Sequence, residues 1–268
     1  MGRCSAEYGS ASDLQRIYQQ CMDISAGGEL GPDEVCLWCF DLRAEPHVVA
    51  KAGAILSFAE RERASRFATD LLRDNFIVAR GILRILLSRY SGLPPESLEF
   101  DYGPQGKPFL TRCSCPISFN MSHSGEIAAY GFAWGCALGV DVEQHRDLPD
   151  RDEIAKRYFS RSEYCELMTV PERERAGAFY ACWVRKEAFL KAKGGGLSIP
   201  LDSFQVSAAP DRPPAILSID GGAREARRWS LHEFFPAAGY SGAVVCDSQR
   251  ALRVHALRSA GEILEAPT

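Results

Sequence analysis

The chain has 268 residues, of which 46% are hydrophobic and 25% are charged, and its formal net charge is -4. This balance is typical of a globular protein with a sizeable core, built as one large domain or as two of about 130 residues. General nucleic-acid binding usually needs a basic surface, so the slightly acidic charge argues against a nucleic-acid partner.

The N-terminal sequence and the ten cysteines indicate the cellular compartment in which the protein is expected. Residues 1–20 lack the apolar core of a secretory signal, and no stretch reaches the roughly 18 apolar residues of a membrane span. We therefore expect a cytoplasmic protein with reduced thiols and no membrane partner. Cys36 and Cys39 lie in an apolar run and are interpreted as buried strand residues, because no second pair or matching histidines complete a zinc site.

The first half of the chain alternates a strand, a helical block and further strands. Residues 1–33 are polar and glycine-containing, which predicts a loosely structured segment. Helical spacing of apolar residues predicts helix over about 50–90, ended by Gly92 and two prolines. Strands are predicted at 35–42, 98–101, 117–121, 127–134 and 137–143.

The second half repeats this order, with helices first and strands after them. Helices are predicted over about 151–193, with a capping box at Ser160 and Glu163 and a stop at Gly194. Strands are predicted at 204–207, 215–219, 229–235 and 241–246. The two halves read as weakly similar α+β units, with a boundary near residue 138.

Two carboxylates share one face of the strand at 139–143. Alternate strand residues point the same way, so Asp141 and Glu143 lie side by side while Val140 and Val142 face the core. Adjacent carboxylates repel unless a cation lies between them, and Mg²⁺ prefers oxygen ligands. The alternative is a strand with a hydrated acidic face.

A helix at 183–191 carries a second set of charges. Glu187 and Lys191 lie one turn apart on the stripe of Trp183, whereas Lys186 falls on a largely apolar stripe. A charge in that position needs a protein partner or an anionic ligand. The alternative for Glu187 and Lys191 is an exposed ion pair.

Two polar segments are candidates for binding phosphate. The strand end at 119–125 presents Ser122, His123 and Ser124 as hydrogen-bond donors; its alternatives are a plain turn, or a serine hydrolase that would lack the usual nucleophile elbow. The tight loop at 103–108 presents Lys107, although alone it would be only a turn. On the first helical block, Arg80 and Arg84 lie close to the apolar stripe and are further ligand candidates.

These motifs, in this order, resemble the phosphopantetheinyl transferase family, of the broad-specificity (Sfp) type. The resemblance rests on four segments and covers about residues 35–247: 106–108, 119–124, 139–143 and 183–191. It implies transfer of the 4′-phosphopantetheine arm of coenzyme A to a serine of an acyl, aryl or peptidyl carrier protein, with release of 3′,5′-ADP. Such carriers serve polyketide, nonribosomal peptide or fatty-acid synthases.

The resemblance also implies roles for individual residues. Asp141, Glu143 and Glu187 would bind Mg²⁺, or Mn²⁺ in its place, with Glu187 also a candidate base for the carrier serine. Lys191 would stabilise the leaving phosphate, so Glu187, Lys191 and Asp141 form the catalytic set. Coenzyme A would be held by Arg63, Lys107, Pro108, Ser122, His123 and Lys186. Some members carry a basic residue where this chain has Glu60, so Arg61 is considered as its substitute.

The implied architecture is an α+β fold of two similar halves related by a pseudo-two-fold axis. Each half would pack a small, mostly antiparallel sheet with helices, and the active site would lie in the cleft between them. We divide the chain into the segment 1–33, a nucleotide-side half at 34–138 and a metal-side half at 139–268. A monomer is expected, because an internally duplicated site needs no second chain.

Two other functions use the same residues. A metal-dependent phosphodiesterase would employ the carboxylates and His123, although such enzymes usually have more histidine and aspartate ligands, and the chain has only five histidines. A non-catalytic module that binds a nucleotide or a carrier protein is the third hypothesis, and it leaves the complete carboxylate set unexplained.

Overall fold

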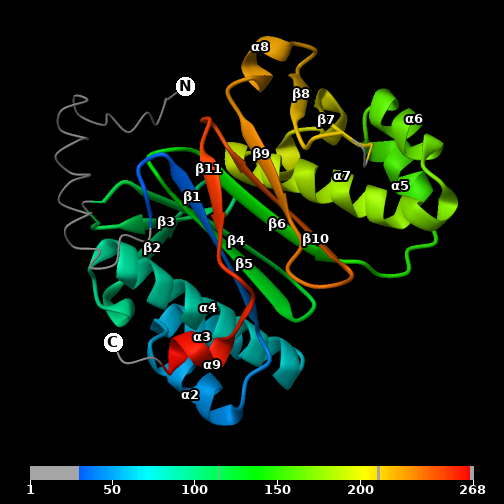
Figure 1. Cartoon of the computed structure of the whole chain (residues 1–268). Helices are drawn as coiled ribbons and strands as arrows, with labels where there is room; N and C mark the ends of the chain where they lie inside the picture. Colours follow the sequence, from blue (N-terminus) through cyan, green and yellow to red (C-terminus); the bar gives the residue numbers. More distant parts are fainter. Residues whose placement is uncertain (1–29, 114, 210–211, 266–268) are drawn as a thin grey trace, which may run out of the picture.

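A computed structural model describes residues 30–113, 115–209 and 212–265 of the chain. Figure 1 shows a central group of strands with helices at both ends and along one side. The expectation for residues 1–33 lies almost entirely outside the described part. Within the described part, no helix is long and apolar enough to cross a membrane.

The N-terminal half is built from one strand, three helices and four further strands. Its elements are β1 (Glu34–Asp41), α2 (Pro46–Ala54), α3 (Phe58–Ala64), α4 (Asp70–Ser91), β2 (Glu99–Tyr102), β3 (Pro108–Thr111), β4 (Ile117–Ser124) and β5 (Ile127–Trp134). The helical block predicted at 50–90 is thus three helices, because the side chains of Ser57 and Thr69 cap two new N-termini within it.

The C-terminal half follows the same order. Its elements are β6 (Leu138–Gln144), α5 (Arg151–Tyr158), α6 (Arg161–Thr169), α7 (Glu172–Lys193), β7 (Phe204–Val206), β8 (Ile216–Ile219), α8 (Ala223–Ala226), β9 (Ser230–Phe234) and β10 (Tyr240–Cys246). The predicted capping box at Ser160 and Glu163 is confirmed, and so is the helix end at Gly194, which is left-handed with φ 70°. Each half therefore packs a 22-residue helix on a small sheet.

Three cores hold the molecule together. One lies between α4 and the sheet ordered β11-β1-β5-β4, and a second lies between α7 and the antiparallel sheet β6-β10-β9. The third lies between the two sheets, where Leu37 and Cys39 meet Val140 and Val244. Cys36 belongs to the first core and Cys39 to the third. The two thiols therefore point to opposite faces of β1, as expected for buried strand residues rather than a shared metal site.

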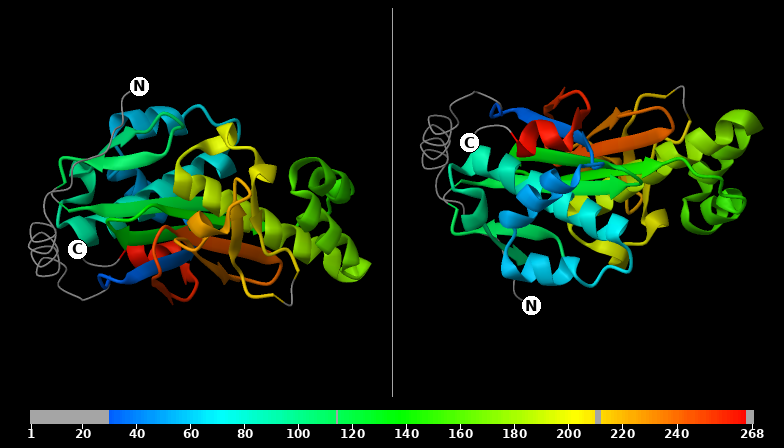
Figure 2. Two further views of the ribbon diagram at one scale, coloured as in Figure 1. Left: turned by 90° about the horizontal axis from the view of Figure 1, so that it is seen from above. Right: turned by 90° about the horizontal axis from the view of Figure 1, so that it is seen from below.

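The chain end departs from the predicted division. Strands β11 (Ala251–Val254) and β12 (Arg258–Ser259) both pair in parallel with β1, and α9 (Ala260–Leu264) packs on α2 and α4. The views from above and below in Figure 2 show this red segment lying against the N-terminal half. Residues 251–264 thus belong to the first half in space, because their apolar residues, Ala260 and Ile263, complete its core. The predicted α+β fold of two similar halves is confirmed.

Candidate active site

Gly139 places α7 directly on β6. A Cβ atom at Gly139 would lie 2.0 Å from the carbonyl oxygen of Ala188 and 2.4 Å from the amide nitrogen of Ala192. Only a residue without a side chain fits there, since real Cβ atoms do not approach backbone so closely. This contact brings one face of α7 over the strand that carries Asp141 and Glu143.

Lys191 and Asp141 form the centre of the site. Asp141 is 3% exposed, and its Oδ1 lies 2.7 Å from Lys191 Nζ and 2.9 Å from Ser122 Oγ. Lys191 Nζ also donates to Ser122 Oγ at 2.8 Å. One residue from each of β4, β6 and α7 therefore meets at this point, so both halves contribute to the site.

Alternate residues of β4 join it to β6 through side chains. Asn120 Oδ1 accepts the amide of Val140 at 2.8 Å, and Ser122 donates to Asp141. Ser124 donates to Glu143 Oε2 at 2.6 Å and accepts the amide of Gln144 at 3.1 Å. We call this line of contacts between β4 and β6 the seam. The intervening residues of β4, among them His123, point to the other face of the strand.

The carboxylates of the site outnumber its cations. Burial raises the pKa of Glu187, and the negative charges of Asp141 and Glu143 raise it further, against the opposing effect of Lys191. Burial also raises the pKa of Glu143, although its bond from Ser124 works in the other direction. Lys191, and Arg146 at Glu143, thus face three carboxylates, and this deficit of positive charge favours a bound cation.

The donor set fits a hard divalent cation at Asp141. The Oδ2 atom of Asp141 is buried and has no hydrogen-bond partner among the described residues. A buried carboxylate oxygen without a partner is costly, and a cation would satisfy it. Within the described ranges, no three His, Cys, Asp or Glu side chains already converge on one point. Glu143 and Glu187 would therefore have to turn towards Asp141 to complete a three-carboxylate site.

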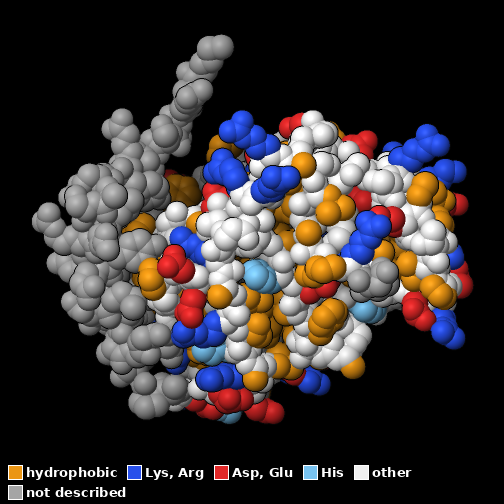
Figure 3. Space-filling model, turned by 45° about the horizontal axis from the view of Figure 1, so that its top comes forward, with side chains coloured by type: hydrophobic (Ala, Val, Ile, Leu, Met, Phe, Trp, Pro, Cys, Tyr) orange, Lys and Arg blue, Asp and Glu red, His pale blue; other side chains and the backbone are white. Residues whose placement is uncertain are grey.

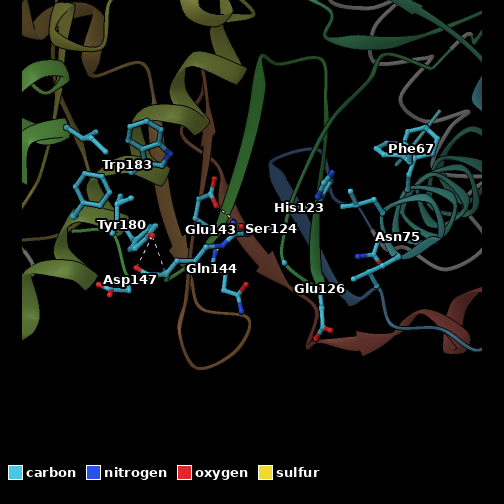
Figure 4. A pocket seen from close by; sticks show the side chains of 18 residues that line it. Phe67, Asn75, His123, Ser124, Glu126, Glu143, Gln144, Asp147, Tyr180 and Trp183 are labelled. Atoms are coloured by element: carbon cyan, nitrogen blue, oxygen red, sulfur yellow. Dashed lines mark hydrogen bonds between the residues drawn. The ribbon is translucent and has the colours of Figure 1, made fainter. Parts of the chain in front are cut away.

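Two adjoining cavities meet at His123, Phe67 and Phe76. The first, of about 790 Å³, lies over the seam between the start of α4 and the middle of α7. Figure 4 shows its two walls, with Phe67 and Asn75 on one side and Tyr180 and Trp183 on the other, and with Ser124, Glu143 and Gln144 between them. The second, of about 970 Å³, is lined by α3, α4 and the β2–β3 hairpin, including Arg63 and Pro108.

His123 lies where the two cavities meet, near the ammonium of Lys191. It lines both cavities, and burial together with the charge of Lys191 lowers its pKa. Arg63 lies at the other side of the second cavity, with its guanidinium 5.4 Å from the ring centroid of Phe76. The structure thus places Arg63, Pro108 and His123 around one cavity. Their contact with coenzyme A stays a prediction, as does the contact predicted for Ser122.

Lys186 does not reach either cavity, which corrects its predicted role as a coenzyme A ligand. It is fully buried, and its Nζ lies 2.8 Å from Glu163 Oε1. It also donates to the carbonyl oxygens of Leu201 at 2.7 Å and Phe204 at 2.9 Å. A charge on an apolar stripe needs either a protein partner or an anionic ligand, and Lys186 has a protein partner.

The candidates Arg80 and Arg84 also have a protein partner. Both pair with Glu60, at 2.6 Å and 2.7 Å, and Arg84 donates further to the carbonyl oxygen of Leu98. Burial raises the pKa of Glu60, but the two arginines and the amide of Ser57 outweigh it and hold the pKa below its usual range. Glu60, which replaces a basic residue of the family pattern, is therefore the anchor of two buried arginines.

Lys107, another predicted ligand of coenzyme A, also has partners within the protein. Lys107 lines neither of these two cavities, and its ammonium donates to the carbonyl oxygens of Leu138 at 2.7 Å and Lys191 at 2.8 Å. The family resemblance assigned Lys107 to the phosphates of coenzyme A, and the sequence of the loop gives no sign that the end of α7 lies beside it. The seam roles of Asn120 and Ser124 were missed as well, although their alternate spacing with Ser122 was a usable signal.

Comparison with known proteins agrees with the sequence motifs. A family model described as the 4′-phosphopantetheinyl transferase superfamily matches residues 137–245, and one described as 4′-phosphopantetheinyl transferase, N-terminal, matches residues 43–131. The chain is 34% identical over 206 residues to the 4′-phosphopantetheinyl transferase HetI of Nostoc sp., which covers 76% of this chain and 84% of that relative.

Two further similarities were found. The 4′-phosphopantetheinyl transferase Sfp of Bacillus subtilis is 34% identical over 158 residues, covering 59% of this chain and 69% of the relative. The holo-[acyl-carrier-protein] synthase of Thermotoga maritima superposes with a TM-score of 0.34 at 22% identity, over 43% of this chain and 65% of that one. On the two family models, which together match well over half of the sequence, and on the long match to HetI, the chain belongs to the 4′-phosphopantetheinyl transferase superfamily.

Proposed function

We propose that this protein transfers the 4′-phosphopantetheine group of coenzyme A to a serine hydroxyl of a carrier protein domain, in a Mg²⁺-dependent reaction at the seam. The observation that carries the proposal is the group of three carboxylates, Asp141, Glu143 and Glu187, near Lys191, with Asp141 Oδ2 lacking a hydrogen-bond partner among the described residues. This arrangement suits a substrate that brings phosphates together with a divalent cation.

The two cavities suit the two parts of coenzyme A. The second cavity supports binding of the nucleotide, because Arg63 offers a positive charge and Phe100 and Tyr102 offer aromatic faces. The first cavity supports binding of the pantetheine arm, because its outer wall includes Leu71 and Leu72, both at least half exposed. His123, at their junction, would then lie near the pyrophosphate. Figure 3 shows apolar side chains gathered near the middle of one face, with lysines and arginines scattered around them.

The proposed chemistry needs charge neutralisation, a base and an activated phosphorus. The serine oxygen attacks the phosphorus that carries pantetheine, the bond from that phosphorus to the bridging oxygen breaks, and 3′,5′-ADP leaves. A bound Mg²⁺ would neutralise the pyrophosphate and make its phosphorus more electrophilic. Lys191 would stabilise the negative charge on the departing phosphate.

Glu187 is the proposed base for the serine proton. Burial raises its pKa, and a carboxylate whose pKa lies closer to neutrality is a better base at physiological pH. A carboxylate has two oxygens, so one can contact the cation while the other accepts the proton. Asp141 and Glu143 would share the remaining protein contacts to the cation, and Ser122 and Ser124 fix their orientation.

The partners follow from this reaction. The acceptor would be an acyl, aryl or peptidyl carrier domain of a polyketide, nonribosomal peptide or fatty-acid synthase. The catalytic set comes entirely from one chain, so a monomer can carry out the reaction. We propose a cytoplasmic location, where coenzyme A and such synthases occur together.

A mass measurement tests the proposal. The protein is incubated with coenzyme A, Mg²⁺ and each of several apo carrier domains, and every carrier is weighed by mass spectrometry. A gain of one phosphopantetheine group, abolished by EDTA and restored by Mg²⁺ or Mn²⁺, is expected. Hydrolysis of coenzyme A without any carrier would favour a phosphodiesterase. Binding of coenzyme A that ignores Mg²⁺ and never turns over would favour a non-catalytic module.

A further inference from the structure

The loop that joins β2 to β3 fixes the direction of Lys107. The amide of Gly103 donates to the carbonyl oxygen of Lys107 at 2.9 Å, and the amide of Gly106 donates to that of Gly103 at 2.8 Å. Gly106 is left-handed, with φ 79°, a conformation that other residues rarely adopt. The turn is therefore closed on itself, and the Lys107 side chain leaves it in one defined direction.

That direction leads to the end of α7. Lys107 Nζ lies 2.8 Å from the carbonyl oxygen of Lys191 and 3.5 Å from that of Ala192, and 2.7 Å from that of Leu138 at the start of β6. Carbonyls in the last turn of a helix have no partner within the helix, and the helix dipole makes this end negative. The lysine thus caps α7 from the other half of the molecule.

The capping contact is partly buried and is not an ordinary surface ion pair. Burial lowers the pKa of Lys107 to about 8, only partly opposed by the nearby Cys136 and Asp247. In the described ranges, no salt bridge joins Lys107 to a carboxylate. A lysine held mainly by carbonyl oxygens acts by fixing backbone position, because carbonyls are directional acceptors.

The backbone that Lys107 holds belongs to a residue of the catalytic centre. Lys191 is contacted at both ends, since its carbonyl oxygen accepts from Lys107 and its ammonium donates to Asp141 and Ser122. The neighbours of Lys107 in the chain, Gly106 and Pro108, line the cavity that we propose for the nucleotide. One short loop therefore touches the nucleotide cavity and the catalytic helix.

We propose that Lys107 is a positioning residue, which sets the place of Lys191 by capping α7 and does not bind a phosphate of coenzyme A. This inference rests on the proposed function, because it assigns Lys191 to the leaving phosphate. It also gives the β2–β3 loop a second role, since a nucleotide seated against Gly106 and Pro108 would press on the cap of the helix that stabilises its departing phosphate.

Steady-state kinetics of two substitutions test the inference. Lys107→Met removes the cap while keeping the apolar stem, and Lys107→Arg keeps a charged donor of different shape. A small misplacement of a catalytic group can cost up to about a hundredfold in rate. We expect Lys107→Met to lower kcat by about tenfold or more with the KM for coenzyme A within about twofold of wild type, and Lys107→Arg to lie in between.

The matched control is Lys193→Met at the same helix end. Lys193 Nζ pairs with Glu225 at 2.9 Å on the surface and has no contact with the catalytic centre. Its replacement should leave kcat and KM unchanged. A Lys107→Met protein with a raised KM for coenzyme A and a normal kcat would mean that the side chain binds a phosphate, which overturns the inference. Normal kinetics combined with weaker resistance to urea would reduce Lys107 to a structural residue and overturn it too.

A double substitution tests whether Lys107 affects the rate through Lys191 or independently of it. If Lys107 works by placing Lys191, then adding Lys107→Met to a Lys191→Met protein should cost less than about twofold in residual rate. A full additional tenfold loss would contradict the inference. Wild-type protein that modifies no carrier would overturn the proposed function and this role with it, whereas an active enzyme indifferent to Lys107→Met would overturn this role alone.

Discussion

Helices α4 and α7 have the same length and the same kind of buried anchor, but of the two only α7 carries residues of the proposed catalytic centre. Each helix has 22 residues and ends at a left-handed glycine, Gly92 or Gly194. In each half the shorter helix that precedes the long one begins with a capping box, whose glutamate is Glu60 or Glu163.

Both capping-box glutamates also pair with a cation at the same place on the long helix. Arg84 and Lys186 each lie fourteen residues after the first residue of their helix. Arg84 donates to Glu60 and to the carbonyl oxygens of Pro95 and Leu98, and Lys186 contacts Glu163 and the carbonyl oxygens of the segment after its own helix. The anchor ties each long helix to the chain segments before and after it.

The difference lies one residue further along. Ile85 of α4 and Glu187 of α7 occupy corresponding places, and β1 is apolar at its centre where β6 carries Asp141 and Glu143. The comparison teaches that both halves have the same arrangement of helices and anchors, whereas the carboxylate set occurs only in the second. Substitutions in the anchors should affect stability in either half, whereas substitutions in the carboxylate set should affect catalysis alone.

The largest expected effect is a loss of transfer activity when Glu187, the carboxylate that α4 lacks, is replaced. Glu187→Gln should lower the rate of transfer by about a hundredfold to a thousandfold, because it removes both a charge for the cation and the proposed base. Folding should not suffer, since burial and its acidic neighbours already disfavour the charged form of Glu187. Carrier modification followed by mass spectrometry gives the rate, and urea unfolding gives the stability.

The control for Glu187→Gln is Glu172→Gln in the first turn of the same helix, where Glu172 lies mostly exposed and pairs with Arg175. It should keep wild-type activity. Near-normal transfer by Glu187→Gln would reject the catalytic role of this carboxylate. The carboxylate would then not be a functional difference between α7 and α4.

The next effect tests the shared anchors. Lys186→Met should lower the free energy of unfolding by about 3–5 kcal/mol, because it leaves the buried Glu163 without its cation. Arg84→Met should cost less, because Arg80 still pairs with Glu60. Replacing Glu163 with Gln in the Lys186→Met protein should recover part of the loss, since no uncompensated charge then remains. Urea denaturation at neutral pH measures all four proteins.

The anchor interpretation fails for Lys186 if Lys186→Met unfolds like wild type but binds coenzyme A weakly. That result would mean that Lys186 binds coenzyme A, and that it does not serve as an anchor in the way that Arg84 does. A loss of stability in both halves, smaller for Arg84→Met than for Lys186→Met, would instead support the anchor interpretation, because Glu60 keeps the second cation Arg80.

A smaller effect is expected where α7 lies on β6. Gly139→Ala should destabilise the protein by about 1–3 kcal/mol, because its methyl group meets the backbone of Ala188 and Ala192 and must push the helix away. Transfer should fall as well, since Glu187 and Lys191 move with the helix. The control is Gly177→Ala in the same helix, where a Cβ would meet nothing within 4 Å; it should stabilise by about 0.5–1 kcal/mol.

The repeated order of elements and the carboxylate positions could be predicted from sequence, because both rest on local periodicity. The capping box at Ser160 and Glu163 and the stop at Gly194 are local signals of the same kind. What could not be predicted depends on contacts between distant segments. The return of β11 to pair with β1 is one example, since a short strand of mixed composition carries no sign of its partner.

The partners of Lys186 and Lys107 show the same limit. Lys186 was recognised as a charge on an apolar stripe that needed a partner, but its partner Glu163 lies 23 residues away on another helix. Lys107 was read from its loop alone, whereas its acceptors come from β6 and the last turn of α7. A lysine that binds phosphate and a lysine that caps a helix have the same sequence environment, and only the tertiary structure tells them apart.

The smallest effect concerns the competition between Lys191 and a cation for Asp141. The ammonium lies 2.7 Å from Asp141 Oδ1 and already neutralises part of the charge that a metal ion would use. Lys191→Met should therefore tighten Mn²⁺ binding in the absence of coenzyme A by about tenfold, or about 1.4 kcal/mol, even though transfer falls.

Electron paramagnetic resonance titration of free Mn²⁺ measures this affinity without any turnover, with Lys193→Met as the control that should not change it. In the wild-type protein, coenzyme A should tighten Mn²⁺ binding by drawing the ammonium towards its phosphates, and this coupling should shrink in Lys191→Met. If Lys191→Met bound Mn²⁺ no better than wild type, the ion would not share Asp141 with the lysine. The proposal that all three carboxylates form one metal site would then be rejected, because Asp141 belongs to that set.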